Sequence, residues 1–212
     1  MFKNIDFKKT KNIFITATNT NIGKTYSCKK LILSLVSKGF KVGYFKPFES
    51  GVINNKPQDG ISMLNLVKQY NKDFIDITIN DVVPYQFELP ASIFVAKKDI
   101  NIDIDLLLEK KQYLEKFCDI LIIEGAGGLM VPIEKNFFII DIIKLFKSYC
   151  ILIVPSNLGS INDNLLSQDI LKKRDIKYSW IINLYKDKTT FNEITLPFYK
   201  QYFGKIEFLD DI

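Results

Sequence analysis

Histidine is absent from this 212-residue sequence. Its absence removes both the commonest general base and the commonest transition-metal ligand of proteins. Any catalysis must therefore depend on lysines, carboxylates, hydroxyls, backbone amides and hard cations such as Mg²⁺. Cysteine is scarce, and Cys28, Cys118 and Cys150 form neither a Cys-x-x-Cys pair nor a metal-binding spacing. This pattern favours buried thiols in a reducing cytoplasm over a disulfide framework.

Long apolar runs are also missing. The first twelve residues, "MFKNIDFKKTKN", are charged, and no later stretch reaches the length of a membrane helix without a charge or a break. We therefore expect a cytoplasmic protein with no secretory signal and no membrane partner. Internal repeats and low-complexity linkers are lacking as well. A length of 212 residues then favours a single domain spanning 1–212.

A block of basic charge is the next missing feature. The net charge of +5 comes from lysines scattered along the chain, a distribution that favours a solvated surface over a nucleic-acid-binding face. No zinc-finger or RNA-binding signature is present, so we expect no nucleic-acid partner. The scattered positive charge is nevertheless suited to attracting anionic substrates.

The sequence does contain a regular alternation of short apolar runs with longer amphipathic stretches. Several apolar runs have no polar face, as expected for parallel strands covered by helices on both sides. The alternation predicts an α/β fold, a single doubly wound domain with a mostly parallel sheet. In such sheets, ligands bind beyond the carboxyl ends of the strands. The predicted strands are 12–17, 41–47, 120–123, 150–155 and 178–183, and the predicted helices are 24–39, 138–147, 161–174 and 192–203, with another from about Ile61.

The stretch "ATNTNIGKTY" (17–26) follows the first predicted strand and contains Gly23-Lys24-Thr25. Such residues close a phosphate-binding loop at a helix N-terminus, where backbone amides and the helix dipole attract anions. We expect Lys24 to reach the β- and γ-phosphates and the Thr25 hydroxyl to bind Mg²⁺. However, Thr18 stands where the usual pattern has its first glycine. A purely structural Gly-Lys-Thr at a helix start therefore stays open at this point.

Charged residues and a glycine-rich run, which are suited to binding a nucleotide or a metal, follow the other predicted strands. Lys46 lies at the end of the second strand, and Glu124 ends the third, where many P-loop proteins carry a metal-binding carboxylate. The run Gly125-Ala126-Gly127-Gly128 allows a backbone to approach a ligand closely, although a tight turn explains it equally well. Lys46 has a plain alternative as a solvated lysine, and Asp59-Gly60 as a turn that caps the following helix.

Together these segments resemble the ATP-dependent dethiobiotin synthetases, which have a fold of the P-loop NTPase type. The resemblance is carried, in the family's order and at about its spacing from residue 12 to 183, by "TATNTNIGKT", "YFKPFESG", Asp59, "VVPYQFELPAS", "IIEGAGGLMVPI", "VPSNLGSIND" and "WIINL". The family's loop reads G-T-x-T-x-x-G-K-T, with one more residue between its glycines. In this chain Ala17 replaces the first of them.

The resemblance implies an ATP-dependent cyclo-ligase of biotin biosynthesis, with 7,8-diaminononanoate, CO₂ and ATP as substrates and Mg²⁺ as cofactor. In the implied reaction an amine captures CO₂ as a carbamate, which attacks the γ-phosphate of ATP. A second amine then closes the ureido ring of dethiobiotin and expels phosphate from the carbamic–phosphoric anhydride. Because the nucleophiles belong to the substrate, the protein mainly positions groups and neutralises charge, which requires no histidine.

The resemblance also assigns roles to residues of this chain. The catalytic residues are Lys46, Lys24 and Thr20, while Ser50 and Thr20 face the diamine and its carbamate. The expected Mg²⁺ ligands are all hard oxygen donors, namely Thr25, Asp59 and Glu124. The residues expected at ATP are Asn21, Ile22, Gly23, Lys24, Thr25, Tyr26, Asp59, Glu124, Gly125, Ala126, Gly127 and Asn183, the last of them hydrogen-bonded to the purine.

Members of this family are homodimers in which the partner subunit receives the substrate's carboxylate. The matching segment here is 158–162, where Leu158, Gly159 and Ser160 are the expected substrate contacts through amides at a helix N-terminus. A plain helix start capped by Ser160 stays open. Two departures from the family affect the nucleotide site. Asn21 stands where a glutamate is frequent, and the short chain after Asn183 predicts weak discrimination between nucleotide bases.

Other functions stay open on the sequence alone. A dimeric ATP switch of the ParA/MinD type carries a signature lysine in its loop, and residues 17–22 contain none. A cobyrinate-type ATP-dependent synthetase appends a glutaminase domain, for which this chain has no room. A nucleotide binder without catalysis is suggested by Ala17 and Asn21. Dependence of ATP hydrolysis on the diamine separates these alternatives.

Overall fold

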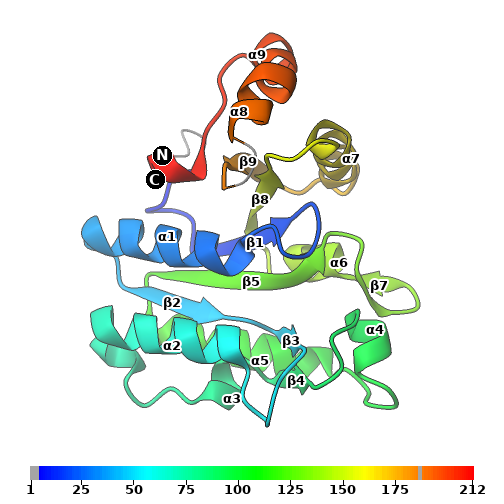
Figure 1. Cartoon of the computed structure of the whole chain (residues 1–212). Helices are drawn as coiled ribbons and strands as arrows, with labels where there is room; N and C mark the ends of the chain where they lie inside the picture. Colours follow the sequence, from blue (N-terminus) through cyan, green and yellow to red (C-terminus); the bar gives the residue numbers. More distant parts are fainter. Residues whose placement is uncertain (1–4, 186–187) are drawn as a thin grey trace.

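Five parallel strands form the main sheet of the computed structural model, in the order β2-β5-β1-β8-β9 (Figure 1). The structure describes residues 5–185 and 188–212. The central position of β1 places the loop that follows it in the middle of the carboxyl edge of the sheet. The arrangement confirms the predicted doubly wound α/β fold. The strands are β1 (Asn12–Ala17), β2 (Val42–Phe45), β5 (Ile120–Gly128), β8 (Tyr149–Pro155) and β9 (Tyr178–Asn183).

Helices cover both faces of this sheet, which explains why its strands carry apolar residues on both sides. Figure 1 shows α1 (Lys24–Ser37) and α2 (Gln58–Tyr70) in front of the sheet, with α6 (Ile139–Leu145) behind it. Consecutive residues of β1, among them Ile13, Phe14 and Ile15, are all at most 1% exposed. The core thus lies on both sides of β1 and β5, and it holds the loops at their ends in place.

The strand β5 continues through Gly125–Gly128, where the sequence analysis expected a strand end and a glycine-rich turn. Ile15 of β1 lies opposite Glu124, but Ala17 lies opposite Gly128, so the residues between form a bulge in β5. A Cβ atom on Gly128 would lie only 3.0 Å from the carbonyl oxygen of Thr18. The glycines therefore serve a bulged strand that passes close to the P-loop, and Glu124 lies within a strand.

The segment between β2 and β5 contains elements that the sequence analysis did not predict. The second predicted strand, 41–47, is present as the shorter β2. A separate β3 (Phe48–Ser50) begins just beyond the predicted end and pairs in parallel with β4 (Tyr85–Phe87). Strands of three residues are too short to carry a periodic pattern. The same segment holds α3 (Ile79–Val82), α4 (Ile93–Ala96), α5 (Ile104–Leu114) and 3₁₀ turns at Lys72–Phe74 and Glu115–Phe117.

The C-terminal part of the chain folds back onto β9 and α1. Trp180 of β9 contacts the rings of Tyr199 and Phe203, and Lys30 of α1 forms an ion pair of 3.2 Å with Asp210. The helix predicted over 192–203 is present, with a π-helical first part. The remaining elements are β6 (Pro132–Glu134), β7 (Phe137–Phe138), α7 (Ser160–Lys173), α8 (Lys188–Thr190), the π-helix Phe191–Thr195, α9 (Leu196–Phe203) and a 3₁₀ turn at Leu209–Asp211.

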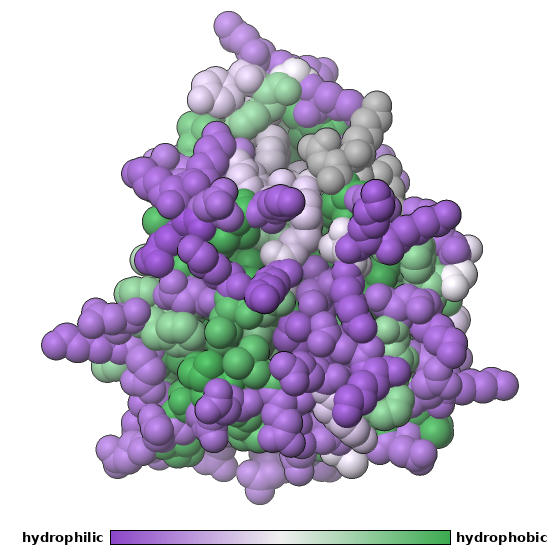
Figure 2. Space-filling view, turned by 180° about the vertical axis from the view of Figure 1, so that it is seen from behind, coloured by the Kyte–Doolittle hydropathy of each residue, from purple (hydrophilic) through white to green (hydrophobic). Residues whose placement is uncertain are grey.

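The surface is mainly hydrophilic on the face seen in Figure 2, and its hydrophilic residues are spread over the whole face with apolar residues between them. Within residues 5–185 and 188–212, no helix combines the length and the apolar character needed to cross a membrane. The cysteines in this part of the chain are all free, with Cys28 and Cys150 buried.

Candidate active site

The loop after β1 has the conformation of a phosphate-binding loop that leads directly into α1. Gly23 precedes the first helical residue with φ +93°, and a Cβ atom there would lie 2.4 Å from Nδ2 of Asn183. Both facts require glycine at this position. The Lys24 ammonium donates to the carbonyl oxygen of Asn19 at 3.1 Å. Burial lowers the pKa of Lys24, an effect that the nearby Glu124 carboxylate partly offsets.

Ala17 and Asn21, the two departures from the family's loop, both fit the local backbone. Ala17 is the last residue of β1 and is not among the residues with positive φ, so no glycine is needed there. Asn21 has φ +58°, a left-handed conformation that asparagine adopts more readily than most residues. Neither substitution therefore distorts the loop.

Lys46 brings together two carboxylates that lie far apart in the sequence. Its ammonium donates to Asp59 Oδ2 at 2.8 Å and to Glu124 Oε1 at 2.7 Å, and Thr25 Oγ1 donates to the same Glu124 oxygen at 2.8 Å. Lys46 is 4% exposed and Glu124 is 1% exposed, which excludes the solvated-lysine alternative. Burial lowers the pKa of Lys46, but the carboxylates of Glu124 and Asp59 outweigh burial, so the net shift of this pKa is upward.

Asp59 lies in the first turn of α2, and a second buried carboxylate holds that turn. Glu49 accepts hydrogen bonds from the backbone amides of Asp59 at 3.1 Å and of Gly60 at 2.9 Å. Burial raises the pKa of Glu49, while Lys46 and the amide of Gly60 counteract the rise. Asp59 is thus a helical residue whose backbone amide is held by Glu49 of β3. Its half-exposed side chain reaches the Lys46 ammonium.

A cavity of about 430 Å³ at the carboxyl edge of the sheet contains all the predicted catalytic and metal-binding residues. A second hollow of about 600 Å³ shares Thr20 and Ser50 with it and has a largely apolar wall formed by Pro90, Ala91, Ile93 and Val131. The first cavity is lined by Thr20, Asn21, Gly23, Lys24, Thr25, Lys46, Phe48, Glu49, Ser50, Asp59, Glu124, Gly125, Ala126 and Gly127.

Other predicted site residues lie outside both hollows. Asn183 lies behind the loop, 4% exposed, and its side-chain nitrogen donates to the carbonyl oxygen of Ile22 at 2.8 Å. Tyr26 lies on the exposed side of α1. Beyond β8, Leu158 is 78% exposed, whereas the Ser160 side chain is fully buried. The residue that caps α7 is Gly159, with φ +91°, and not Ser160 as the plain alternative assumed.

Comparison with known proteins identifies the family. A family model described as an AAA domain matches residues 11–212. The ATP-dependent dethiobiotin synthetase of Sulfurovum sp. (strain NBC37-1) is 46% identical over 91% of this chain and 91% of its own length. That of Wolinella succinogenes is 37% identical over 90% of this chain and 89% of its own.

This chain belongs to the ATP-dependent dethiobiotin synthetase family. It is an ATP-dependent ligase that closes a ring in biotin biosynthesis, as the sequence resemblance implied. Among solved structures, a plasmid partition protein from Borrelia burgdorferi matches with a TM-score of 0.56 at 17% identity, over 93% of this chain and 88% of that one. The MinC:MinD complex of Aquifex aeolicus matches with a TM-score of 0.54 at 18% identity, over 94% and 79%. At such identity these structures show the shared fold alone.

Three residues near the synthetase site were missed by sequence reasoning. Tyr44 donates its hydroxyl to Glu124 Oε2 at 2.8 Å, Glu49 holds the first turn of α2, and Tyr185 donates its hydroxyl to the Asn21 carbonyl at 2.9 Å. Burial raises the pKa of Tyr44, so its hydroxyl stays protonated as a donor at neutral pH. The available signal for Glu49 was its place in the segment "YFKPFESG", between Lys46 and Ser50.

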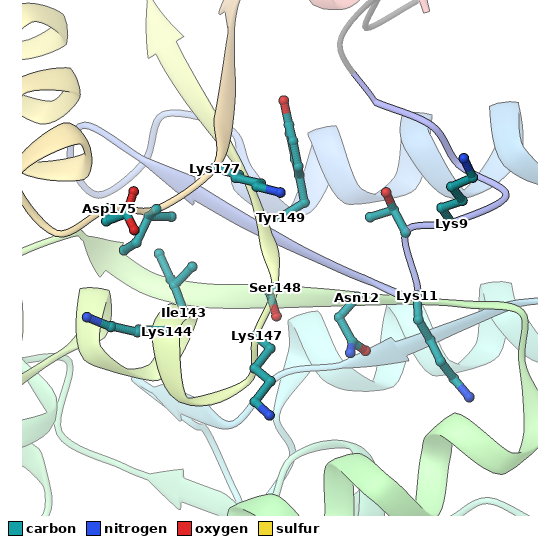
Figure 3. A pocket seen from close by; sticks show the side chains of 12 residues that line it. Lys9, Lys11, Asn12, Ile143, Lys144, Lys147, Ser148, Tyr149, Asp175 and Lys177 are labelled. Atoms are coloured by element: carbon teal, nitrogen blue, oxygen red, sulfur yellow. The ribbon is translucent and has the colours of Figure 1, made fainter.

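A hollow of about 470 Å³ at the opposite, amino edge of the sheet has a lysine-rich wall. Figure 3 shows that these lysines point away from one another and do not converge on one point. Lys144 and Lys147 lie at the carboxyl end of α6, where positive charge complements the helix dipole. We therefore attribute the charge of Lys144 and Lys147 to the helix end and place the chemistry at the carboxyl edge.

Proposed function

We propose that this enzyme converts 7,8-diaminononanoate, CO₂ and ATP into dethiobiotin, ADP and phosphate through a carbamate and a carbamic–phosphoric anhydride. The observation that carries this proposal is the position of Lys46, whose ammonium lies between Asp59 and Glu124 in the cavity of the P-loop. This cavity adjoins a hollow with an apolar wall. A buried cation in the P-loop cavity, beside a hollow with an apolar wall, is suited to an anion formed on an alkyl diamine.

The P-loop is the proposed site of the triphosphate. Lys24, now bonded to the Asn19 carbonyl, has a flexible chain that can exchange this partner for a phosphate oxygen. The amides at the start of α1 supply further donors. The low exposure of Lys24 supports a strong electrostatic interaction with a bound phosphate, since little water would screen it.

Mg²⁺ is the proposed cofactor, and the oxygen donors present fit this ion. Asp59 and Glu124 both accept hydrogen bonds from the Lys46 ammonium, and Thr25 donates to the same Glu124 oxygen, so the three oxygen donors lie close together in the cavity. Within the described residues no group of three or more carboxylates, thiols or imidazoles is gathered for a metal. Two carboxylates and one hydroxyl suit Mg²⁺, which usually keeps several water ligands. When bound, Mg²⁺ would neutralise charge on the phosphates.

The substrate's reacting end is proposed to lie near Thr20, Ser50 and Lys46, with its alkyl chain against the apolar wall. The carbamate oxygen forms a bond to the γ-phosphorus while the bond to ADP breaks. The second amine then attacks the carbamate carbon, phosphate leaves, and that amine loses a proton. Lys46 is the group placed to neutralise the carbamate and the transferring phosphoryl group.

The active assembly is proposed to be a homodimer. Leu158 and Gly159 lie beyond β8 at the same edge of the sheet as the P-loop, but neither lines the cavity of its own subunit. Their exposure supports a contact with the substrate of a partner subunit. Because the Ser160 side chain is buried, only the backbone of this segment would reach the substrate's carboxylate.

Phosphate release from ATP, measured with and without diaminononanoate and bicarbonate, tests the proposed reaction. A synthetase releases phosphate only when both co-substrates are present, and it forms dethiobiotin in equal amount. Phosphate release that ignores the diamine would contradict the proposal. Omitting either co-substrate in turn provides the internal control.

A further inference from the structure

The two oxygens of the Glu124 carboxylate face different surroundings. Oε1 accepts hydrogen bonds from Thr25 and Lys46 and faces the nucleotide cavity. Oε2 accepts a hydrogen bond of 2.8 Å from the hydroxyl of Tyr44, which is 0% exposed. The carboxylate is therefore held from both sides, by the site on one side and by the core on the other.

The register of two strands produces this arrangement. Tyr44 of β2 lies directly opposite Ile122 of β5. Glu124 lies two residues further along β5, so it is on the same face of the sheet and diagonal to Tyr44. An aromatic side chain is long enough to span that diagonal. Lys46, two residues after Tyr44, reaches the other oxygen of the same carboxylate.

The Tyr44 hydroxyl supplies the hydrogen bond that holds Glu124 Oε2. Phenylalanine would fill the same apolar space, but Glu124 Oε2 would then lose the Tyr44 donor in a site that is 99% buried. Glu124 would keep Thr25 and Lys46 at Oε1 and the Cys28 thiol, which is a weak donor, so its carboxylate could turn more easily about its last side-chain bond. Residues that support a metal ligand in this way determine its orientation and affinity.

We propose that Tyr44 is a positioning residue that orients Glu124, so that Oε1 faces the cavity for the cation. This inference rests on the proposed role of Glu124 as an Mg²⁺ ligand. Tyr44 touches neither cavity and acts only through the carboxylate. Its loss is therefore expected to weaken metal binding while leaving the P-loop contacts with the nucleotide in place.

The test is Tyr44→Phe, with Tyr149→Phe as a matched control. Tyr149 also forms a phenol hydrogen bond, of 2.8 Å to Ser179, but at the opposite edge of the same sheet. Titration calorimetry would measure Mg²⁺ binding to the ADP complex, and kinetics would measure the Mg²⁺ concentration for half-maximal rate. For Tyr44→Phe we expect both constants to rise about tenfold, with ADP affinity in the absence of metal unchanged. Tyr149→Phe should leave all three values at wild-type level.

A double-mutant cycle separates this inference from the proposed function. If Tyr44 acts through Glu124, adding Tyr44→Phe to Glu124→Gln should weaken Mg²⁺ binding no further. Weak binding in Glu124→Gln with normal binding in Tyr44→Phe would overturn the inference and leave the proposed metal site intact. Normal binding in Glu124→Gln would overturn the metal site itself. A Tyr44→Phe protein that fails to fold while Tyr149→Phe folds would also contradict a role limited to positioning.

Discussion

Lys24 shows how a single side chain in this protein is prepared for an anion. Its ammonium is largely removed from water, and its hydrogen bond is to one neutral carbonyl group of the loop. Burial lowers its pKa, which means that the charged form lacks full compensation in the nucleotide-free protein. A triphosphate would supply that compensation, so binding and catalysis depend on Lys24 more than folding does.

We therefore expect Lys24→Ala to abolish turnover without unfolding the protein. Losing a charge directed at the transferring phosphoryl group should cost on the order of 3 kcal/mol, or about a hundredfold or more in kcat/KM. Steady-state kinetics and the Tm would be compared with those of Lys11→Ala, a lysine at the opposite edge of the sheet. Wild-type activity of Lys24→Ala would exclude the loop as the phosphate site.

The preference of the enzyme for one nucleotide base is expected to depend on Asn183. A carboxamide free to turn would accept adenine or guanine equally. Here the side-chain nitrogen donates to the Ile22 carbonyl, which fixes the carboxamide. Asn183 is only 4% exposed, so a base that reaches this buried side chain would meet its oxygen. An oxygen accepts from the amino group of adenine or cytosine and is left unpaired by the carbonyl of guanine. We expect kcat/KM to be about tenfold higher or more for ATP than for GTP, with CTP less affected. Equal values for ATP and GTP would contradict the fixed orientation.

At the scale of elements, α2 is placed by a side chain that belongs to another element. Glu49 of β3 offers both carboxylate oxygens to the first amides of α2 and so takes the role of an N-cap. Since Asp59 lies in that turn, the same contact determines where its carboxylate stands relative to Lys46. Glu49 thus links the small β3–β4 sheet to the catalytic lysine.

Glu49→Gln should weaken this link, because one amide of α2 then loses its acceptor. We expect a loss of about 1–2 kcal/mol in the free energy of unfolding, together with a higher Mg²⁺ requirement. Asp103→Asn is the matched control, since Asp103 caps α5 away from the site through the amides of Asp105 and Leu106. Urea denaturation and Mg²⁺ titration of the rate would be measured for both. If Glu49→Gln were as active as Asp103→Asn at every Mg²⁺ concentration, Glu49 would only cap α2, and its proposed effect on the metal site would be contradicted.

The same elements explain which features could be read from the sequence. The strand β1, the P-loop and α1 follow one another, so local pattern was enough to predict them. The β3–β4 pair joins two three-residue strands 35 or more positions apart, and no local pattern reports such pairing. The bond from Tyr44 to Glu124 depends on register between β2 and β5, which is decided by packing of the whole sheet. Of the predicted residues, Lys24, Lys46 and Glu124 therefore line one cavity, while Tyr44 and Glu49, which support them, could not be found from local pattern.

At the scale of the whole molecule, the strand order bears on the proposed homodimer. The segment after β8 lies beside the P-loop edge, because β8 pairs directly with β1. Leu158 is nevertheless 78% exposed and lines neither of the two hollows described at this edge. If the substrate's carboxylate meets this segment, it must do so on a second subunit, and each site would then combine residues of two chains.

Mixing two inactive variants tests whether the sites are shared. Lys24→Ala removes the P-loop charge, and Gly159→Val strains the φ of +91° that starts α7, although a Cβ atom there would meet nothing within 4 Å. Each homodimer should be inactive. In a heterodimer with shared sites, one site has both defects and the other has neither. Random assembly of equal amounts should therefore restore about a quarter of wild-type activity. If each subunit completes its own site, every site in the mixture carries one defect, and activity should stay at the level of the separate variants.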